Sequence, residues 1–264
     1  MAKPTPSFLK ALGRRPLPPS VTAKGKTYAL VRVFKHDFFA ATAEYEGDAG
    51  KVLLKVGRQA RCFGIPLRWV GRWLAKREMA ALEKLAGVRG IPRLIDRWED
   101  TGFVRDFVDG QPLAKGMHVR DEFHDELSGL VDVIHKHGMA YVDLEKCENV
   151  LVGDDGKPHL FDFQISWQWS RSWGGEFWPV RRLRRFFQNG DRYHLVKLKR
   201  RTRPDLMSPE ALAASYRRPW TVRVHRFVTW PFTAVRRAVL NKIDPRAKRG
   251  ERGRVSENDS IGAT

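Results

Sequence analysis

Cysteine is scarce in this sequence, where Cys62 and Cys147 are the only two among 264 residues. Neither lies in a paired spacing, which argues against a zinc site and against a disulfide framework. The sequence also lacks any stretch close to the roughly 20 apolar residues that a membrane-spanning helix needs. Residues 1–20 have no apolar core of the kind found in secretory signals. We therefore expect a monomeric protein of the reducing cytoplasm, attached to a membrane only peripherally on its inner face.

Negative charge is also in short supply, because 49 Lys and Arg residues stand against 30 Asp and Glu residues. The formal net charge is +19 at pH 7, so the surface must present cations to an anionic partner or stay soluble through mutual repulsion. Nucleic acid, anionic lipid and acidic glycolipid are the candidate partners.

Composition and hydrophobic periodicity divide the chain into successive regions. We expect a flexible basic arm over residues 1–26, a lobe of sheet plus one helix over 27–108, a compact and mainly helical lobe over 109–215, a basic aromatic amphipathic segment over 216–245 and a disordered tail over 246–264.

The first lobe has the pattern of an antiparallel sheet. Residues 28–34, 40–46 and 51–56 predict three strands, which turn signals at His36–Asp37 and at residues 47–50 separate. A helix follows over residues 67–85, and residues 91–100 and 102–108 predict two more strands. The fold class is therefore α+β.

The second lobe begins with a helical pattern in which apolar side chains share one face, namely Phe123, Leu127, Leu130, Val131 and Ile134. Residues 149–161 then predict a tight hairpin, with Asp162 just past its second strand. Another helix is expected to start at Asp191, within a strongly basic stretch that we expect to form a solvated helix pair or an anion-binding surface.

Residues 130–166, LVDVIHKHGMAYVDLEKCENVLVGDDGKPHLFDFQIS, resemble the catalytic core of protein kinases, with its catalytic loop, hairpin and Asp-Phe-Gly motif. The resemblance implies that Asp143 is the catalytic aspartate and Asn149 the metal-binding asparagine. Asp162 matches the aspartate of Asp-Phe-Gly, and Phe163 follows it.

The resemblance extends upstream and covers residues 28–165 in all. Residues 52–55, Val-Leu-Leu-Lys, match the strand motif that ends in the catalytic lysine, and Glu78 matches the glutamate that pairs with Lys55. Asp106 and Val108 match positions that bind the nucleotide. The implied architecture is a two-lobed protein-kinase-like fold with an antiparallel-sheet N-lobe and a reduced, mainly helical C-lobe.

Phosphoryl transfer from ATP depends on positioning and charge neutralisation, which gives each matched residue a chemical role. Lys55 would hold the α- and β-phosphates and Glu78 would hold Lys55. Asn149 and Asp162 offer the oxygen ligands that Mg²⁺ prefers. Asp143 would orient the acceptor hydroxyl and receive its proton.

Simpler interpretations exist for single residues. Lys55 could be a solvated lysine at the end of an ordinary strand, and Glu78 a surface residue of the helix. Asp162 is harder to explain in this way, because a carboxylate among Phe161, Phe163 and Ile165 is costly to bury without a partner.

The sequence departs from the kinase pattern at several places. No glycine occurs between Leu30 and Glu46, so backbone donation to phosphate from the turn at residues 36–41 is in doubt. Tyr141 and Val142 replace the usual His and Arg, one extra residue separates Asp143 from Asn149, and no Ala-Pro-Glu follows. These features are closer to the compact bacterial lipopolysaccharide-core sugar kinases and the small atypical kinases.

Three functions remain open at this point. The leading hypothesis is an ATP- and Mg²⁺-dependent kinase that phosphorylates a sugar of a lipopolysaccharide or glycolipid precursor at the cytoplasmic membrane face. The alternatives are an atypical Ser/Thr protein kinase and an inactive kinase fold that serves as a binding scaffold. Residues 220–240, rich in Trp and Arg without acids, favour an anionic membrane over nucleic acid as the partner.

Overall fold

The computed structural model describes residues 6–169 and 177–217. Within these ranges the chain forms two compact units. Unit 1 contains the residues up to Met79 together with Arg93–Phe107. Unit 2 contains Ala80–Pro92 and the described residues from Val108 onward.

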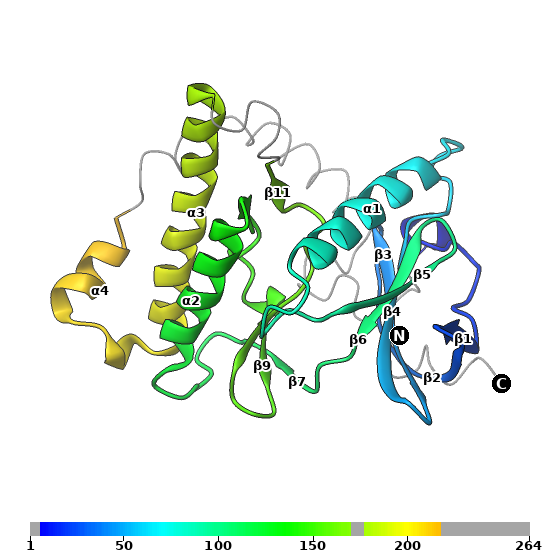
Figure 1. The fold of residues 1–264 in the computed structure, drawn as a ribbon, viewed down its shortest axis with the longest axis horizontal. Coiled ribbons are helices and arrows are strands. Elements are labelled where there is room, and N and C mark those ends of the chain that lie inside the picture. The colour runs from blue at the N-terminus through cyan, green and yellow to red at the C-terminus, as the bar shows by residue number, and fades with distance from the viewer. Residues whose placement is uncertain (1–5, 170–176, 218–264) are drawn as a thin grey trace. The chain divides into compact units, whose positions relative to one another are not determined.

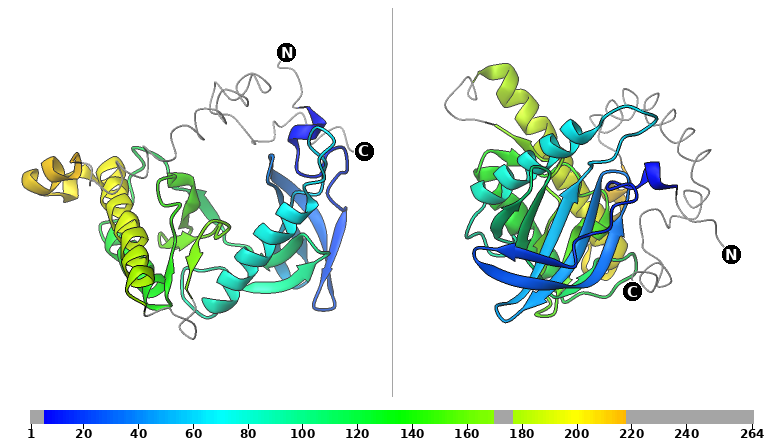
Figure 2. Two further views of the ribbon diagram at one scale, coloured as in Figure 1. Left: turned by 90° about the horizontal axis from the view of Figure 1, so that it is seen from above. Right: turned by 90° about the vertical axis from the view of Figure 1, so that its right-hand side faces the viewer.

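Six antiparallel strands form the sheet of unit 1, in the order β1-β2-β3-β4-β6-β5 (Figures 1 and 2). Their bounds are β1 Ser20–Ala23, β2 Lys26–His36, β3 Ala40–Gly47, β4 Gly50–Gly57, β5 Leu94–Trp98 and β6 Gly102–Asp106. The five strands that the sequence predicts are confirmed as β2 to β6. The apolar runs lie within the strands, and the turn signals lie where the chain reverses.

Strand β4 lies inside the sheet, between β3 and β6, and its side chains point alternately to the two faces of the sheet. Val52, Leu54 and Val56 pack in a buried apolar cluster with residues of β1, β2 and β3. Since successive side chains of a strand point to opposite faces, Lys55 belongs to the other face.

Helix α1, Arg68–Lys84, runs along that other face of the sheet (Figure 1). Gly71 lies so close to the chain after β4 that an added Cβ atom would be 2.1 Å from the carbonyl oxygen of Arg58. A Cβ atom on Gly57 would likewise be 2.8 Å from the carbonyl oxygen of Gly71. Two glycines thus allow the helix to approach the strand, and Glu78 lies two helical turns beyond Gly71 on the same side.

The expectation of a flexible arm over residues 1–26 is wrong for the part that the structure describes. A short 3-10 helix, η1 Ser7–Leu9, and strand β1 lie in this region, and Leu12 and Leu17 are buried in the apolar cluster. Arg58, which is fully buried, donates hydrogen bonds to the carbonyl oxygens of Phe8 and Phe38. Burial of these apolar side chains stabilises an ordered segment, which the Pro-rich composition did not predict.

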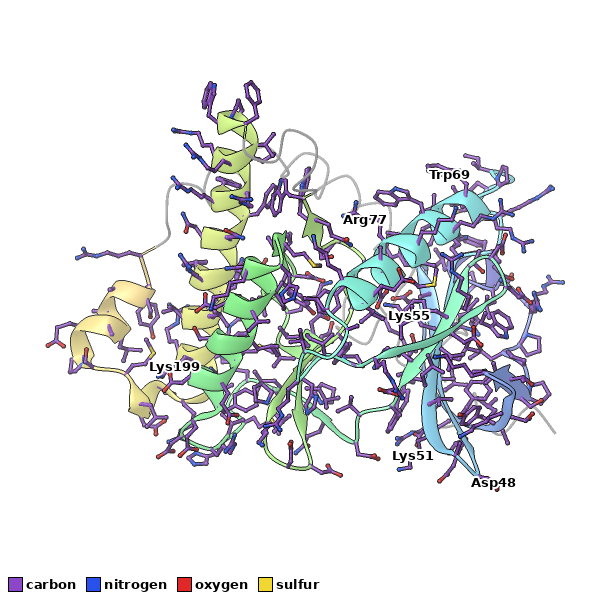
Figure 3. The ribbon with its side chains drawn as sticks, viewed as in Figure 1. Asp48, Lys51, Lys55, Trp69, Arg77 and Lys199 are labelled. Carbon is purple, nitrogen blue, oxygen red and sulfur yellow. The ribbon has the colours of Figure 1, made fainter. Side chains whose placement is uncertain are left out.

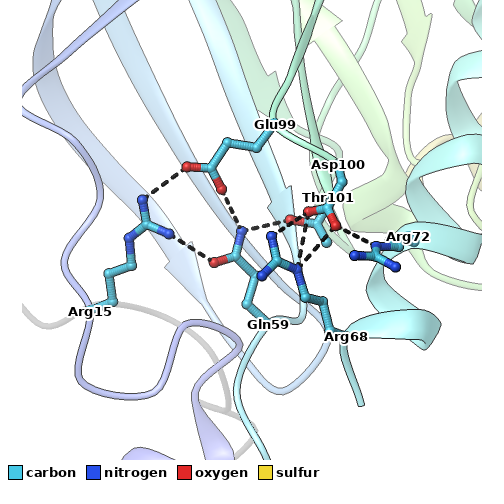
Figure 4. A network of polar contacts seen from close by, with 7 residues as sticks. All are labelled: Arg15, Gln59, Arg68, Arg72, Glu99, Asp100 and Thr101. Carbon is cyan, nitrogen blue, oxygen red and sulfur yellow. Dashed lines mark hydrogen bonds and ion pairs between the residues drawn. The ribbon is translucent and has the colours of Figure 1, made fainter. Parts of the chain in front are cut away.

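A polar network adds a second connection to this segment (Figure 4). Arg15 bonds both Gln59 and Glu99, and Gln59 in turn donates to Glu99 and to Thr101. Next to it, Arg68 and Arg72 at the start of α1 pair with Asp100 in the turn between β5 and β6.

Unit 2 combines short strands with helices. Its elements are β7 Gly110–Pro112, α2 Phe123–Lys136, β8 Met139–Ala140, η2 Cys147–Asn149, β9 Val150–Gly153, β10 Pro158–Leu160, β11 Trp167–Gln168, α3 Trp178–Thr202, η3 Pro204–Leu206 and α4 Pro209–Ser215. The predicted hairpin is confirmed as β9 and β10, with Leu160 opposite Val150. Strands β10, β9 and β7 form one small sheet, and β11 and β8 form another.

The prediction that a helix starts at Asp191 is wrong. Asp191 lies in the middle of α3, a single helix of 25 residues that packs beside α2 (Figure 1). Asn189-Gly190 has the composition of a turn, yet burial of Asp191, Leu198 and Thr202 keeps the helix continuous. The predicted amphipathic segment at 216–245 lies outside the described residues from 218 onward, as does the predicted tail.

Candidate active site

Lys55 and Glu78 form an ion pair inside unit 1. The Lys55 Nζ atom lies 2.7 Å from Glu78 Oε2, and the two side chains are only 10% and 1% exposed. The interpretations of a solvated lysine and a surface glutamate are therefore wrong. A buried ion pair is weak evidence for stability, because desolvation offsets most of the attraction. A functional role is therefore the better explanation for this pair.

The turn between β2 and β3 has its own carboxylate cap. Asp37 Oδ1 accepts hydrogen bonds from the backbone N–H groups of Phe39 and Ala40, at 2.8 and 2.9 Å. Arg58 holds the carbonyl oxygen of Phe38, and Ala11 N–H donates to that of Asp37. In a glycine-rich loop, backbone amides at these positions would point towards phosphate. Here the amides of Phe39 and Ala40 donate to Asp37 within the turn instead.

Asp106 and Val108, the two remaining predicted nucleotide-binding residues, lie on either side of the unit boundary. Asp106 ends β6, and its carboxylate forms a partly exposed ion pair with Arg93, with 3.4 Å between Nε and Oδ2. Val108 is half-buried at the start of unit 2.

Asp143 and Asn149 come together in unit 2. Asn149 Nδ2 donates to Asp143 Oδ2 at 2.8 Å and to the Asp143 carbonyl oxygen at 3.1 Å. Lys146 Nζ lies 2.6 Å from the same carboxylate oxygen. The loop between the two residues ends in the 3-10 turn η2, from which Asn149 reaches back to Asp143 despite the extra residue.

Asn149 and Asp162 flank the same end of the β9–β10 hairpin, since Asn149 precedes Val150 and Asp162 follows Leu160 by two residues. The hydroxyl of the buried Tyr141 donates to the carbonyl oxygens of Asn149 and Phe161, so one side chain joins both sides of the hairpin end. Asp162 has a φ of 65°, in the left-handed region that is uncommon for residues other than glycine.

Asp191 holds the backbone that leads to Asp143. Its carboxylate, fully buried, accepts hydrogen bonds from the N–H groups of Tyr141 and Val142 at 2.8 and 2.7 Å and contacts His135 Nε2 at 2.9 Å. Val142 has a φ of 72°, which is costly for a β-branched residue and persists only where its surroundings enforce it. Asp191 provides that enforcement one residue before Asp143.

Tyr141 and Asp191 position the candidate site, and the sequence alone did not indicate this for either residue. Tyr141 entered only as a departure from the kinase pattern, although its ring also packs edge-on against Phe163 with 5.1 Å between centroids. Asp191 carried a signal in the sequence, because it is the single acid among ten Lys and Arg residues between Arg181 and Arg203. A lone acid in such a stretch is a candidate for burial with a specific partner.

The donor set of unit 2 fits Mg²⁺. Because Asn149 Nδ2 donates to Asp143, the amide oxygen is the atom that can coordinate a cation, and Asp162 adds a carboxylate. Mg²⁺ commonly takes one or two such ligands and completes its shell with water and phosphate oxygens. In the described part of the chain no group of three or more His, Cys, Asp or Glu residues could hold a metal by itself.

No family model and no curated protein matches this chain. Two solved structures of the Rio2 kinase from Chaetomium thermophilum match its fold. The ADP/Mg²⁺–phosphoaspartate complex has 16% identity and a TM-score of 0.51, covering 72% of this chain and 62% of that one. The second structure has 16% identity and a TM-score of 0.50, covering 74% and 70%.

This chain has a protein-kinase-like fold. The predicted α+β class, with an antiparallel-sheet N-lobe and a reduced helical C-lobe, is thereby confirmed. At this identity the likeness establishes the fold alone. Within the described residues, no helix is both long and apolar enough to cross a bilayer.

Proposed function

We propose that this protein is an ATP- and Mg²⁺-dependent phosphotransferase with an alcohol acceptor. The observation that carries the proposal is the buried ion pair of Lys55 and Glu78, because the kinase-like fold gives that pair a purpose that stability does not. Lys55 binds the α- and β-phosphates, and Glu78 keeps the lysine oriented.

Residues of unit 2 supply the rest of the chemistry. Asn149 and Asp162 hold Mg²⁺, which neutralises charge on the phosphates when it is bound. Asp143 accepts the proton of the acceptor hydroxyl as the new O–P bond forms and the bond to the ADP oxygen breaks. The contacts of Asp143 with Lys146 and Asn149 fix its carboxylate in one orientation, which favours this step.

For the acceptor, we favour a Ser or Thr hydroxyl of a protein over a sugar of a glycolipid. The similarity to the Rio2 kinase supports an atypical protein kinase, whereas neither the structure nor the comparisons support a lipopolysaccharide substrate. Residues 220–240, on which the membrane hypothesis depended, lie outside the described part of the chain.

ATP labelled at the γ-phosphate tests this function in a cell extract that contains both proteins and lipids. We expect Mg²⁺-dependent, acid-stable label on protein with the wild type, and a loss of at least about a hundredfold with Lys55→Met and with Asp162→Asn. Arg192→Met serves as the matched control, because it removes an exposed cation whose partner, Asp132, is half-exposed and lies outside the candidate site. Label in the lipid fraction would instead support the glycolipid kinase, and no turnover at all would support the scaffold.

A further inference from the structure

The segment that leads into α1 exposes large apolar side chains. Phe63 is 71% exposed and Ile65 60%, while Trp69 and Trp73 on the helix are 65% and 53% exposed. Such side chains are usually scattered singly on a protein surface, whereas here they occupy consecutive turns of one short stretch. A cluster of exposed apolar side chains of this kind indicates an interaction surface.

These side chains lie on two consecutive segments of the chain, a small hairpin and the first turns of α1. Cys62 and Ile65 exchange both backbone hydrogen bonds across a two-residue turn, so Phe63 lies at the tip of a small hairpin. Phe63 has a φ of 48°, as that turn requires. Trp69 and Trp73 follow one helical turn apart, and Figure 3 shows Trp69 on the side of α1 that faces away from the sheet.

The surrounding charge is mainly positive. Residues 61–77 contain five Lys and Arg residues and no acid. Arg68 and Arg72 pair with Asp100, whereas Arg61 and Lys76 are exposed. The Arg77 guanidinium lies 4.9 Å from the centre of the Trp73 ring. The nearest acid along the chain, Glu78, is buried in its pair with Lys55 and does not neutralise this surface.

We propose that this basic aromatic patch, formed by Arg61, Phe63, Ile65, Trp69, Trp73 and Lys76, binds the surface of a bilayer that contains anionic phospholipids. The Trp rings lie at the headgroup level, Phe63 and Ile65 enter the acyl boundary, and Arg61 and Lys76 meet lipid phosphates. The proposal is independent of the phosphotransferase activity, because none of these residues belongs to the candidate active site.

Single-stranded RNA would also attract Arg and aromatic side chains, but the patch fits lipid better. Ile65 has no ring on which a base could stack, yet it is exposed beside Phe63 at the hairpin. Residues 61–77 also contain no Asn, Gln, Ser or Thr, the neutral polar residues that commonly contact bases. Aliphatic exposure combined with cations is typical of interfacial membrane binding.

Sedimentation of the full chain with vesicles tests the proposal, using phosphatidylcholine with and without phosphatidylglycerol. We expect Trp69→Ser/Trp73→Ser to weaken binding to the anionic vesicles at least about tenfold, and Arg61→Gln/Lys76→Gln to weaken it roughly 25-fold at low salt. Phe63→Ser, at the hairpin tip, should weaken it about threefold.

Helix α3 offers matched controls, because Trp178 is 65% exposed, the same as Trp69, and is also followed by arginines. Trp178→Ser and Arg181→Gln/Arg182→Gln should change binding less than about twofold. Circular dichroism of each variant checks that the fold is intact. Equal losses in the α3 variants, or unchanged vesicle binding in the patch variants, would overturn the proposal. So would patch variants that lose binding to single-stranded RNA while keeping binding to vesicles.

Discussion

In unit 1 the position of a candidate catalytic charge depends on close packing, whereas in unit 2 it depends on hydrogen bonds to the backbone. Glu78 reaches Lys55 because glycines bring α1 close to the chain at the end of β4. Asp143 instead follows a strained residue, Val142, whose N–H group is held by Asp191 from a helix 49 positions further along the chain. The two units should therefore respond differently to small changes.

Packing and hydrogen bonding also differ in how they fail. A helix packed through glycines loses its position when volume is added, because interiors have few voids to absorb an extra methyl group. A carboxylate that holds backbone N–H groups fails when its oxygen atoms are removed, because buried donors then lose their partners. The predictions below use this difference, and they run from the largest expected effect to the smallest.

Asp191→Ala should be the most damaging of these substitutions. It removes the acceptor for the N–H groups of Tyr141 and Val142 and the partner of His135, so the free energy of unfolding should fall by about 3–5 kcal/mol. Urea denaturation followed by circular dichroism measures the loss. Asp132→Ala is the control, since that carboxylate is half-exposed and forms a weak surface pair with Arg192, 3.7 Å away. Similar losses in both variants would mean that the buried network contributes little.

Gly71→Ala should cost about 1–3 kcal/mol of unfolding free energy, because its Cβ atom would meet the Arg58 backbone. Gly129→Ala is the matched control: Gly129 also lies in a helix, and no atom comes within 4 Å of an added Cβ atom. That substitution should be neutral or stabilising by up to about 1 kcal/mol. If both changes are equally harmless, the approach of α1 to β4 is not tight, and the contrast between the units fails.

Acid should weaken both units, and His36 and His124 are the histidines whose pKa values are lowered furthest. Burial lowers the pKa of His36 in unit 1 from 6.5 to about 4, with a further contribution from nearby Lys10. Burial likewise lowers the pKa of His124 in unit 2 to about 4, with Lys199 adding to the effect. Each neutral ring makes a hydrogen bond: His36 accepts from the Leu12 N–H group, and His124 contacts Thr202 Oγ1 at 2.7 Å.

The unfolded chain protonates these histidines near pH 6.5 and the folded chain only near pH 4, so the unfolded state binds more protons between those values. Their contribution is complete above pH 6.5 and is lost as the pH falls towards 4. Urea midpoints from about pH 7 to about pH 4.5 should fall in the wild type and fall less in His36→Gln and in His124→Gln. An unchanged slope in either variant would show that its histidine titrates normally in the folded state.

Local patterns in the sequence were sufficient for most of the architecture. The turn signals and apolar alternation of residues 28–56 predict β2, β3 and β4, because a strand's period and its turns are set by neighbouring residues. The same holds for α2, whose apolar face repeats at helical spacing. Lys55 and Glu78 could be paired only through the resemblance to kinases, and their functions stay predictions.

Other features needed contacts between distant residues. The N-terminal segment is rich in proline and lysine, and only the sheet and Arg58 decide that Leu12 and Leu17 are buried. The turn-like Asn189-Gly190 lies within α3, where the residues that follow it, Asp191, Leu198 and Thr202, are buried. Local propensity is worth less than about 1 kcal/mol per ordinary residue, so such packing overrides it.

The sequence by itself determined the alternation of strands and helices, the excess of positive charge and the order of the candidate catalytic residues. The tertiary structure decided that Asp191 holds the backbone before Asp143 and that Tyr141 joins the two sides of the hairpin end. The physical reason is that a carboxylate is stable in the interior only where several donors converge on it. Those donors come from residues about 50 positions away, and only the folded chain brings them together.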